Sequence, residues 1–129
     1  MKTFAALAGA AAAALSMHAA QAAGDAKAGA AIYERCAACH SVEEDRAGPR
    51  HCGLFGRRAG SVPGFSYSDG MKGSKLVWSA ASLDRFLADP GALVPGTPMA
   101  IARVADAKER ADLIAYLREA ADPKRCRAR

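Results

Sequence analysis

Cys36-Ala37-Ala38-Cys39-His40 is the stretch that decides how this chain folds. Two thiols three positions apart, followed at once by an imidazole, form the C-x-x-C-H pattern that attaches a c-type haem. Each thiol adds across one vinyl group of the porphyrin, and the histidine that follows lies beneath the ring, where its nitrogen reaches the iron. The motif predicts one covalently bound haem c, held by Cys36 and Cys39, with His40 as an axial ligand.

Two other kinds of site use a C-x-x-C pair. Half of a zinc site would need a second pair of ligands, and a thioredoxin-like redox pair would need a βαβ unit around it. Neither context is visible in the sequence, so both are kept as weaker alternatives to the haem.

The beginning of the chain has the three parts of a secretory signal peptide. Lys2 precedes an apolar run from Phe4 to Leu15, and Ala20-Gln21-Ala22 forms a small-residue cleavage site, so we expect residues 1–22 to be removed. The run is short for a membrane span, and an uncleaved anchor is the alternative. The pattern predicts a periplasmic protein that is not stably inserted in a membrane.

Cleavage after Ala22 would leave 107 residues, enough for one small domain. We place the domain at residues 23–122 and a basic tail at 123–129. Loss of Lys2 lowers the formal net charge from +5 to +4, which suits acidic protein surfaces and is too small to indicate nucleic acid. The tail is expected to be solvated. Its charged residues are Lys124, Arg125, Arg127 and Arg129.

A helix is predicted directly before the haem motif. Asp25 is a possible N-cap, and apolar or small residues then recur at helical spacing up to Cys36. Gly29 lies on this stripe and costs about 1 kcal/mol relative to alanine inside a helix. Close approach of a second helix would explain a glycine there.

Two further helices are predicted near the end of the chain. The first contains Leu83, Phe86 and Leu87 and stops at Asp89-Pro90. The second opens with Asp106 and Glu109 spaced like a capping box and ends before Asp122. We expect the last helix to cross the first at Gly29. Its apolar face is Leu113, Tyr116, Leu117 and Ala120.

No period persists from Ser41 to Lys75, where glycine and proline recur. A loop of this length is unusual in a compact domain, but loops can bury apolar side chains against a rigid porphyrin. The candidates for that shell are Leu54, Phe55, Phe65 and Tyr67.

Met99 is the predicted second axial ligand. It follows Pro95-Gly96-Thr97-Pro98, a turn-rich stretch that we expect to be non-helical, and thioether sulfur is a recognised partner of histidine on haem iron. Met71 is the only rival, because Met1 and Met17 belong to the signal peptide.

From Gly24 to about Ala121 the chain resembles a class I cytochrome c, close to mitochondrial cytochrome c and bacterial cytochrome c2. The resemblance implies an all-α fold in which three main helices and long loops enclose one haem, and the first and last helices cross. The matching stretches, besides the haem motif, are Gly48-Pro49, Gly53–Arg57, Gly64–Asp69, Trp78, Pro95–Met99 and Asp112–Leu117.

The resemblance also implies roles for single residues. The carbonyl of Pro49 would orient His40. The residues that would hydrogen-bond or screen the haem propionates are Arg57, Tyr67, Trp78 and Thr97.

Two departures from the family pattern bear on function. His51 and Cys52 stand where the mitochondrial proteins have a leucine and usually a histidine, and we expect His51 to be out of position for a role in the core. The docking lysines that flank the methionine in the family are missing, and only Arg35 and Arg103 remain.

The resemblance implies a one-electron carrier of the respiratory or photosynthetic chain and not an enzyme. Its partners would be a cytochrome bc1-type donor and an oxidase or reaction-centre acceptor, and it would be a monomer. The alternatives are a haem protein that binds or senses peroxide or nitric oxide after Met99 dissociates, and a dedicated electron acceptor of one periplasmic dehydrogenase.

The haem accounts for two of the four cysteines and leaves Cys52 and Cys126. In an oxidising compartment this pair is expected to form a disulfide. In the resembling fold the position of Cys52 lies near the end of the last helix, close to where the tail begins. Two free thiols, or a bridge between molecules, are the alternatives.

Overall fold

The computed structural model of the chain describes residues 23–127. The predicted signal peptide, residues 1–22, and Arg129 of the predicted tail lie outside this range. Within it the one β pairing is an isolated bridge between Arg58 and Val77, so the all-α prediction is confirmed. No helix in residues 23–127 is long and apolar enough to cross a membrane. The helices are α1 (Ala26–Tyr33), α2 (Asp69–Gly73), α3 (Ala80–Ala88), α4 (Pro90–Leu93), the 3-10 helix η1 (Pro98–Ile101) and α5 (Ala107–Ala120).

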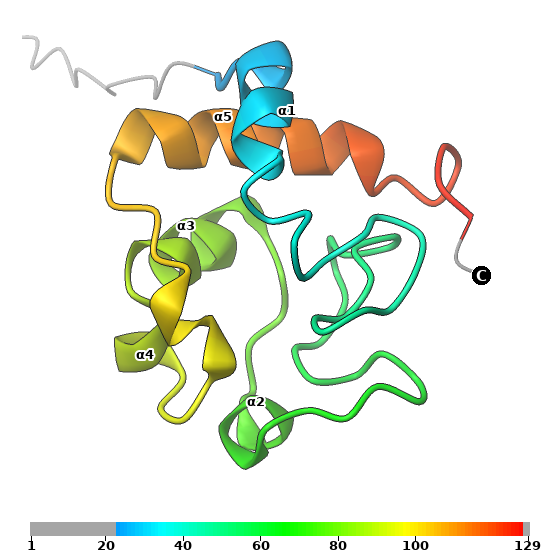
Figure 1. Cartoon of the computed structure of the whole chain (residues 1–129), viewed down its shortest axis with the longest axis vertical. Coiled ribbons are helices and arrows are strands. Elements are labelled where there is room, and N and C mark those ends of the chain that lie inside the picture. Colours follow the sequence, from blue (N-terminus) through cyan, green and yellow to red (C-terminus); the bar gives the residue numbers. More distant parts are fainter. Residues whose placement is uncertain (1–22, 128–129) are drawn as a thin grey trace, which may run out of the picture.

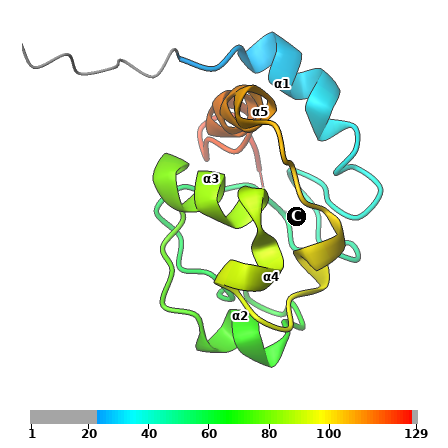
Figure 2. The same cartoon turned by 90° about the vertical axis from the view of Figure 1, so that its left-hand side faces the viewer.

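The first and last helices cross, as predicted (Figure 1, Figure 2). A side chain at Gly29 would overlap the backbone carbonyl of Asp112 and would bring its Cβ within 2.8 Å of the Cβ of Tyr116. Glycine is therefore required at position 29, because the backbones of the two helices touch there. The Asp112 carboxylate adds a second link between the helices, since it accepts hydrogen bonds from the Asp25 backbone N–H at 2.8 Å and from Lys108 Nζ at 2.7 Å.

An aspartate side chain caps the N-terminus of α1 and of α5. Asp25 accepts from the backbone N–H groups of Lys27 and Ala28, as an N-cap does. Asp106 accepts from the N–H of Glu109 at 2.8 Å, but the Glu109 side chain pairs with Arg35 at 2.7 Å and does not return to Asp106. The predicted capping box is thus only half formed, because the Glu109 side chain forms an ion pair with Arg35 in the loop after α1.

Three short helical segments were not expected. α2 lies inside the predicted loop region, where Ser68 accepts from the N–H of Met71. α4 starts at Pro90 after its N-cap Asp89, since proline is tolerated at the first helical position. Met99 lies in η1, so the prediction that its segment is non-helical was wrong. Segments of four or five residues are too short to produce a hydrophobic period.

Backbone hydrogen bonds between distant segments hold the long loops in place. The N–H of Gly56 donates to Trp78 O at 2.8 Å, and the N–H of Ala59 donates to Leu76 O at 2.9 Å. Gly53 N–H reaches Ala121 O, beyond the end of α5, at 2.8 Å. In Figure 1 the loops of residues 40–66 consequently lie on one side of the molecule, opposite α3, α4 and η1.

A disulfide in the structure links Cys52 in these loops to Cys126 in the tail, with Cα atoms 5.7 Å apart. Cys126 is buried, whereas the basic residues Lys124, Arg125 and Arg127 are exposed. Lys124, Arg125 and Arg127 are therefore exposed to solvent, as expected for the basic cluster, while the bridge and a turn after Asp122 tie Cys126 to the domain.

We expect Gly29→Ala to lower the free energy of unfolding by about 2 kcal/mol, because overpacking a rigid contact costs more than the gain of roughly 1 kcal/mol in helix propensity. Urea unfolding of the haem-loaded protein, followed by circular dichroism, measures this. Gly73→Ala in α2 is the matched control, because a Cβ at Gly73 meets nothing within 4 Å. Equal stability of the two variants would contradict the close crossing.

Candidate functional site

The haem-binding motif leaves the end of α1 as a series of hydrogen-bonded turns. α1 ends at Tyr33. The N–H of Cys36 then donates to Tyr33 O at 2.8 Å, and the N–H of His40 donates to Cys36 O at 2.9 Å. Cys36 is partly buried and Cys39 is exposed, and both thiols are free. Burial raises the pKa of Cys36, and nearby Arg35 lowers it. Both sulfur atoms are therefore available for thioether bonds.

His40 is buried and is fixed by its Nδ1 atom, which lies 2.8 Å from the carbonyl oxygen of Pro49. A carbonyl can only accept, so Nδ1 carries the proton. Burial lowers the pKa of His40 and keeps the ring neutral, although the bond to Pro49 acts in the opposite direction. Within residues 23–127 nothing hydrogen-bonds Nε2. The arrangement presents the nitrogen lone pair that a metal ligand needs.

Gly48 gives the His40 ring its space. A Cβ at Gly48 would lie 2.6 Å from both Nδ1 and Nε2 of that ring. Gly48 N–H also donates to Cys39 O at 2.7 Å, which closes the loop over the motif. The Gly48-Pro49 pair thus contributes both the room and the hydrogen-bond acceptor for the histidine.

His51 lies against His40, and the expectation that it is out of position for a core role was wrong. Its ring is stacked on the His40 ring, with centroids 4.3 Å apart and planes 21° from parallel. Its Nδ1 is 3.0 Å from the hydroxyl of Tyr33. Burial first, then the neighbouring His40 and Arg57, lower the pKa of His51 to about 3. The neutral, flat histidine occupies the place where a leucine was the family norm.

Met99 lies in η1, on the turn that follows the Pro95-Gly96 loop. The buried Thr97 side chain accepts from the Met99 N–H at 3.3 Å and caps this turn. Met99 is partly buried and packs against the core cluster. Its rival Met71 is more fully buried, within α2, and belongs to the core itself.

Three of the residues expected around the propionates lie close together. Arg57 donates to the carbonyls of Cys52 and Arg50, both at 2.9 Å. The Tyr67 hydroxyl accepts from the N–H of Val62 at 3.1 Å, and the charge of Arg57 is near enough to oppose the rise in the Tyr67 pKa that burial causes. The backbone N–H of Trp78 donates to Arg57 O at 2.9 Å. These side chains and backbone groups brace one loop cluster.

The four apolar residues expected to surround the haem do not all lie together. Leu54 is buried in the core, and Phe55 and Tyr67 pack against it. Phe65 meets Tyr67 edge to face, with ring centroids 4.7 Å apart. Phe55 has the guanidinium of Arg118 over its ring at 4.7 Å, so this ring contacts the α5 side of the molecule.

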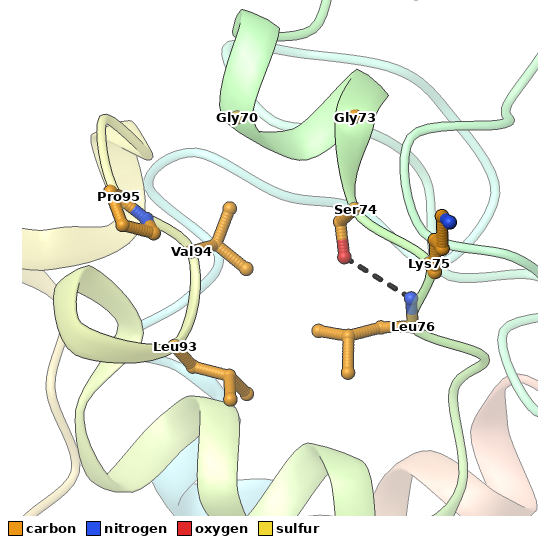
Figure 3. A pocket seen from close by; sticks show the side chains of 8 residues that line it. All are labelled: Gly70, Gly73, Ser74, Lys75, Leu76, Leu93, Val94 and Pro95. Atoms are coloured by element: carbon orange, nitrogen blue, oxygen red, sulfur yellow. Dashed lines mark hydrogen bonds between the residues drawn. The ribbon is translucent and has the colours of Figure 1, made fainter.

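Two cavities within residues 23–127 differ in their relation to these groups. One of about 440 Å³ lies between α2 and the end of α4 and includes none of the predicted ligands (Figure 3). The other, of about 400 Å³, is lined by His40. Cys36, Cys39 and Met99 line neither cavity, so the site is located by the motif and its donor groups and not by a cavity.

The donor set fits a covalent haem. A c-type haem uses two thiols three residues apart, an imidazole and a thioether. Here Cys36 and Cys39 are free, the Nε2 atom of His40 has no hydrogen-bond partner within residues 23–127, and Met99 lies on a capped turn. The other two cysteines are joined to each other, so they do not complete a zinc site with Cys36 and Cys39.

Comparison with known proteins agrees with this reading. The cytochrome c family profile matches residues 26–121. Cytochrome c of Gibberella zeae is 45% identical over 100 residues, which cover 74% of this chain and 94% of the relative. Cytochrome c2 of Rhodomicrobium vannielii is 44% identical over 101 residues, covering 76% and 81%.

A solved structure extends the agreement to three dimensions. Cytochrome cH from Methylobacterium extorquens superposes with a TM-score of 0.71 at 42% identity, covering 74% of this chain and 99% of that structure. The chain therefore belongs to the cytochrome c family and is a class I c-type cytochrome with one covalently bound haem c.

Proposed function

We propose that this small haem electron carrier works in the periplasm, with His40 and Met99 as the axial ligands of its iron. The observation that carries the proposal is the hydrogen bond from His40 Nδ1 to Pro49 O, next to two free thiols. It fixes a neutral imidazole with Nε2 available at the point where the covalent attachment would place the iron.

The haem would supply an iron that gains or loses one electron. Cys36 and Cys39 would hold it permanently, and His40 and Met99 would fill both axial positions and leave no site for a substrate. Pro49 and Gly48 restrain the His40 ring, and Thr97 restrains the turn of Met99. Ligands held in this way move little between oxidation states, which favours rapid electron exchange.

One observation favours the alternative of a haem that binds peroxide or nitric oxide. η1 contains no buried residue, and Met99 itself is partly exposed, so its segment is less tightly packed than α3 or α5. A thioether on such a turn could leave the iron and admit a small ligand. Substitution of Met99, described below, separates the two functions.

The proposed partners are a cytochrome bc1-type donor and an oxidase or reaction-centre acceptor, or a single periplasmic dehydrogenase. The sequence pattern of residues 1–22 supports export, and several similar proteins are named cytochrome c2. Exchange between such partners would need only transient contact, which suits a small monomer.

The two arginines that remain in place of the family's docking lysines differ in their pairing. Arg35 is paired with Glu109 at 2.7 Å, whereas Arg103 donates Nε–H to the neutral carbonyl of Ala88 and keeps its charge. Ile101, two residues after Met99, is 95% exposed. Contact through the surface around Met99 would therefore rely on apolar area more than on attraction between opposite charges.

Met99→Ala should leave the haem covalently attached but remove the weak far-red sulfur-to-iron band of the oxidised protein. The reduction potential should fall by roughly 0.1 V or more, within the range of about 0.8 V that axial ligands span. Added imidazole should then bind the iron. Optical spectra and redox titration measure these effects.

Met71→Ala is the matched control, because it shortens a methionine that is not the proposed ligand. It should keep the far-red band. Loss of the band in this variant, with retention in Met99→Ala, would reverse the ligand assignment. Imidazole binding to the unsubstituted protein as readily as to Met99→Ala would favour the ligand-binding function.

Electron transfer to a membrane oxidase should slow only modestly as salt rises. Between 0.01 and 0.1 M salt the Debye length shrinks from about 30 to about 10 Å, and we expect a fall of at most about threefold. Stopped-flow kinetics measure this. A fall of about tenfold or more, abolished by Arg35→Gln with Arg103→Gln, would show that these two arginines steer docking.

The disulfide between Cys52 and Cys126 should be present in protein isolated from the periplasm. Non-reducing peptide mapping should recover one linked pair of peptides that contain these residues. By the chain-entropy relation a loop of this length stabilises by about 4 kcal/mol, and attached haem should reduce that gain. Two alkylatable thiols in fresh protein, or a disulfide-linked dimer, would refute the intramolecular bridge.

A further inference from the structure

We propose that His51 is a positioning residue for His40: its ring lies flat on the His40 ring, is held there by Tyr33, and fixes the plane of that imidazole. The inference rests on the proposed role of His40 as an iron ligand. It concerns a position at which this chain departs from the family pattern.

The contact restrains a motion that the Pro49 hydrogen bond leaves free. A single bond at Nδ1 fixes one point of the His40 ring but allows the ring to tilt about the line from Nδ1 to Pro49 O. With centroids 4.3 Å apart and planes 21° from parallel, the His51 ring covers one face of His40 and opposes such a tilt. A leucine would fill the space without presenting a flat surface.

Two sets of contacts hold His51 itself. Its backbone N–H donates to Ser41 O at 3.1 Å, one residue after His40. Its Nδ1 lies 3.0 Å from the hydroxyl of the buried Tyr33, whose ring also meets it edge-on with centroids 5.7 Å apart. Among residues 23–127 this is the one hydrogen bond of the Tyr33 hydroxyl, and the tautomer of His51 decides which of the two groups donates. Either direction holds the ring at Nδ1.

Tyr33 connects this pair to the crossing of the terminal helices. It is the last residue of α1, and its ring packs on Tyr116 of α5, with centroids 5.1 Å apart. The order of contacts is therefore Tyr116, Tyr33, His51 and His40. The helix crossing sets the position of Tyr33, and Tyr33 sets the position of the ring that lies on the proposed ligand.

The first test uses the unsubstituted holoprotein in its reduced, diamagnetic state. Long-range proton–nitrogen correlation spectra should show His51 as a neutral ring in a single tautomer, because its hydrogen bond to Tyr33 holds Nδ1 in one role. A ring that exchanges between both tautomers would mean that Tyr33 does not hold it as proposed, and would overturn the inference. Because this measurement needs no variant, it does not depend on the folding of any substitution.

The second test compares variants in the oxidised state, where the spread of the haem methyl proton shifts follows the plane of the axial imidazole. His51→Leu should change this spread, and His51→Phe, which restores a flat ring, should return it toward the original pattern. Tyr33→Phe should shift it in the same direction as His51→Leu. Tyr116→Phe is the matched control and should have no effect, since within residues 23–127 the Tyr116 hydroxyl has no hydrogen bond.

An unchanged spread in His51→Leu, or the same change in His51→Phe as in His51→Leu, would overturn the inference. Failure of the proposed function would look different. In that case the unsubstituted protein would itself lack the far-red band and the strongly shifted resonances of His40. Thermal unfolding of each variant shows whether a change in the spread follows a general loss of stability, and a spread that tracked stability alone would also refute the positioning role.

Discussion

Direct contact between the backbones of α1 and α5 at Gly29 is the constraint on which the rest of this structure depends. No side chain separates the two helices there, and the carboxylate of Asp112 also binds the start of α1. This contact fixes the direction in which α1 ends. Because the haem motif follows Tyr33 within three residues, the crossing also fixes where Cys36 enters the site.

The region beyond the motif has little regular structure, yet it holds its shape. Its backbone groups bond to segments far away in sequence, such as Trp78 and Ala121, and the disulfide from Cys52 fastens it to the end of the chain. The same loops deliver the carbonyl of Pro49 and the ring of His51 to His40. The same interactions thus support both the proposed ligand His40 and the loops around it, although this region itself contains little helix.

Much of this could be predicted from local patterns. The C-x-x-C-H motif indicated the cofactor, which family membership confirmed, because thioether attachment requires that spacing whatever the fold around it. Helical periodicity located α3 and α5, and a glycine on the stripe of α1 predicted a close crossing. The family resemblance indicated that the carbonyl of Pro49 faces His40, and the structure has a distance of 2.8 Å there.

Other features were decided only by tertiary structure. α2, α4 and η1 are too short to produce a period, so their caps become apparent only when the chain is folded. Glu109 matches a capping box in sequence, but folding brings Arg35 within 2.7 Å and an ion pair forms in its place. The position of His51 could not be predicted, because it depends on a contact with Tyr33, eighteen positions earlier in the chain.

The sequence by itself determined the covalent chemistry and the main helices, since these depend on residues close together in the chain. The ring that lies on His40 depends on contacts between distant segments, and only the folded chain could decide it.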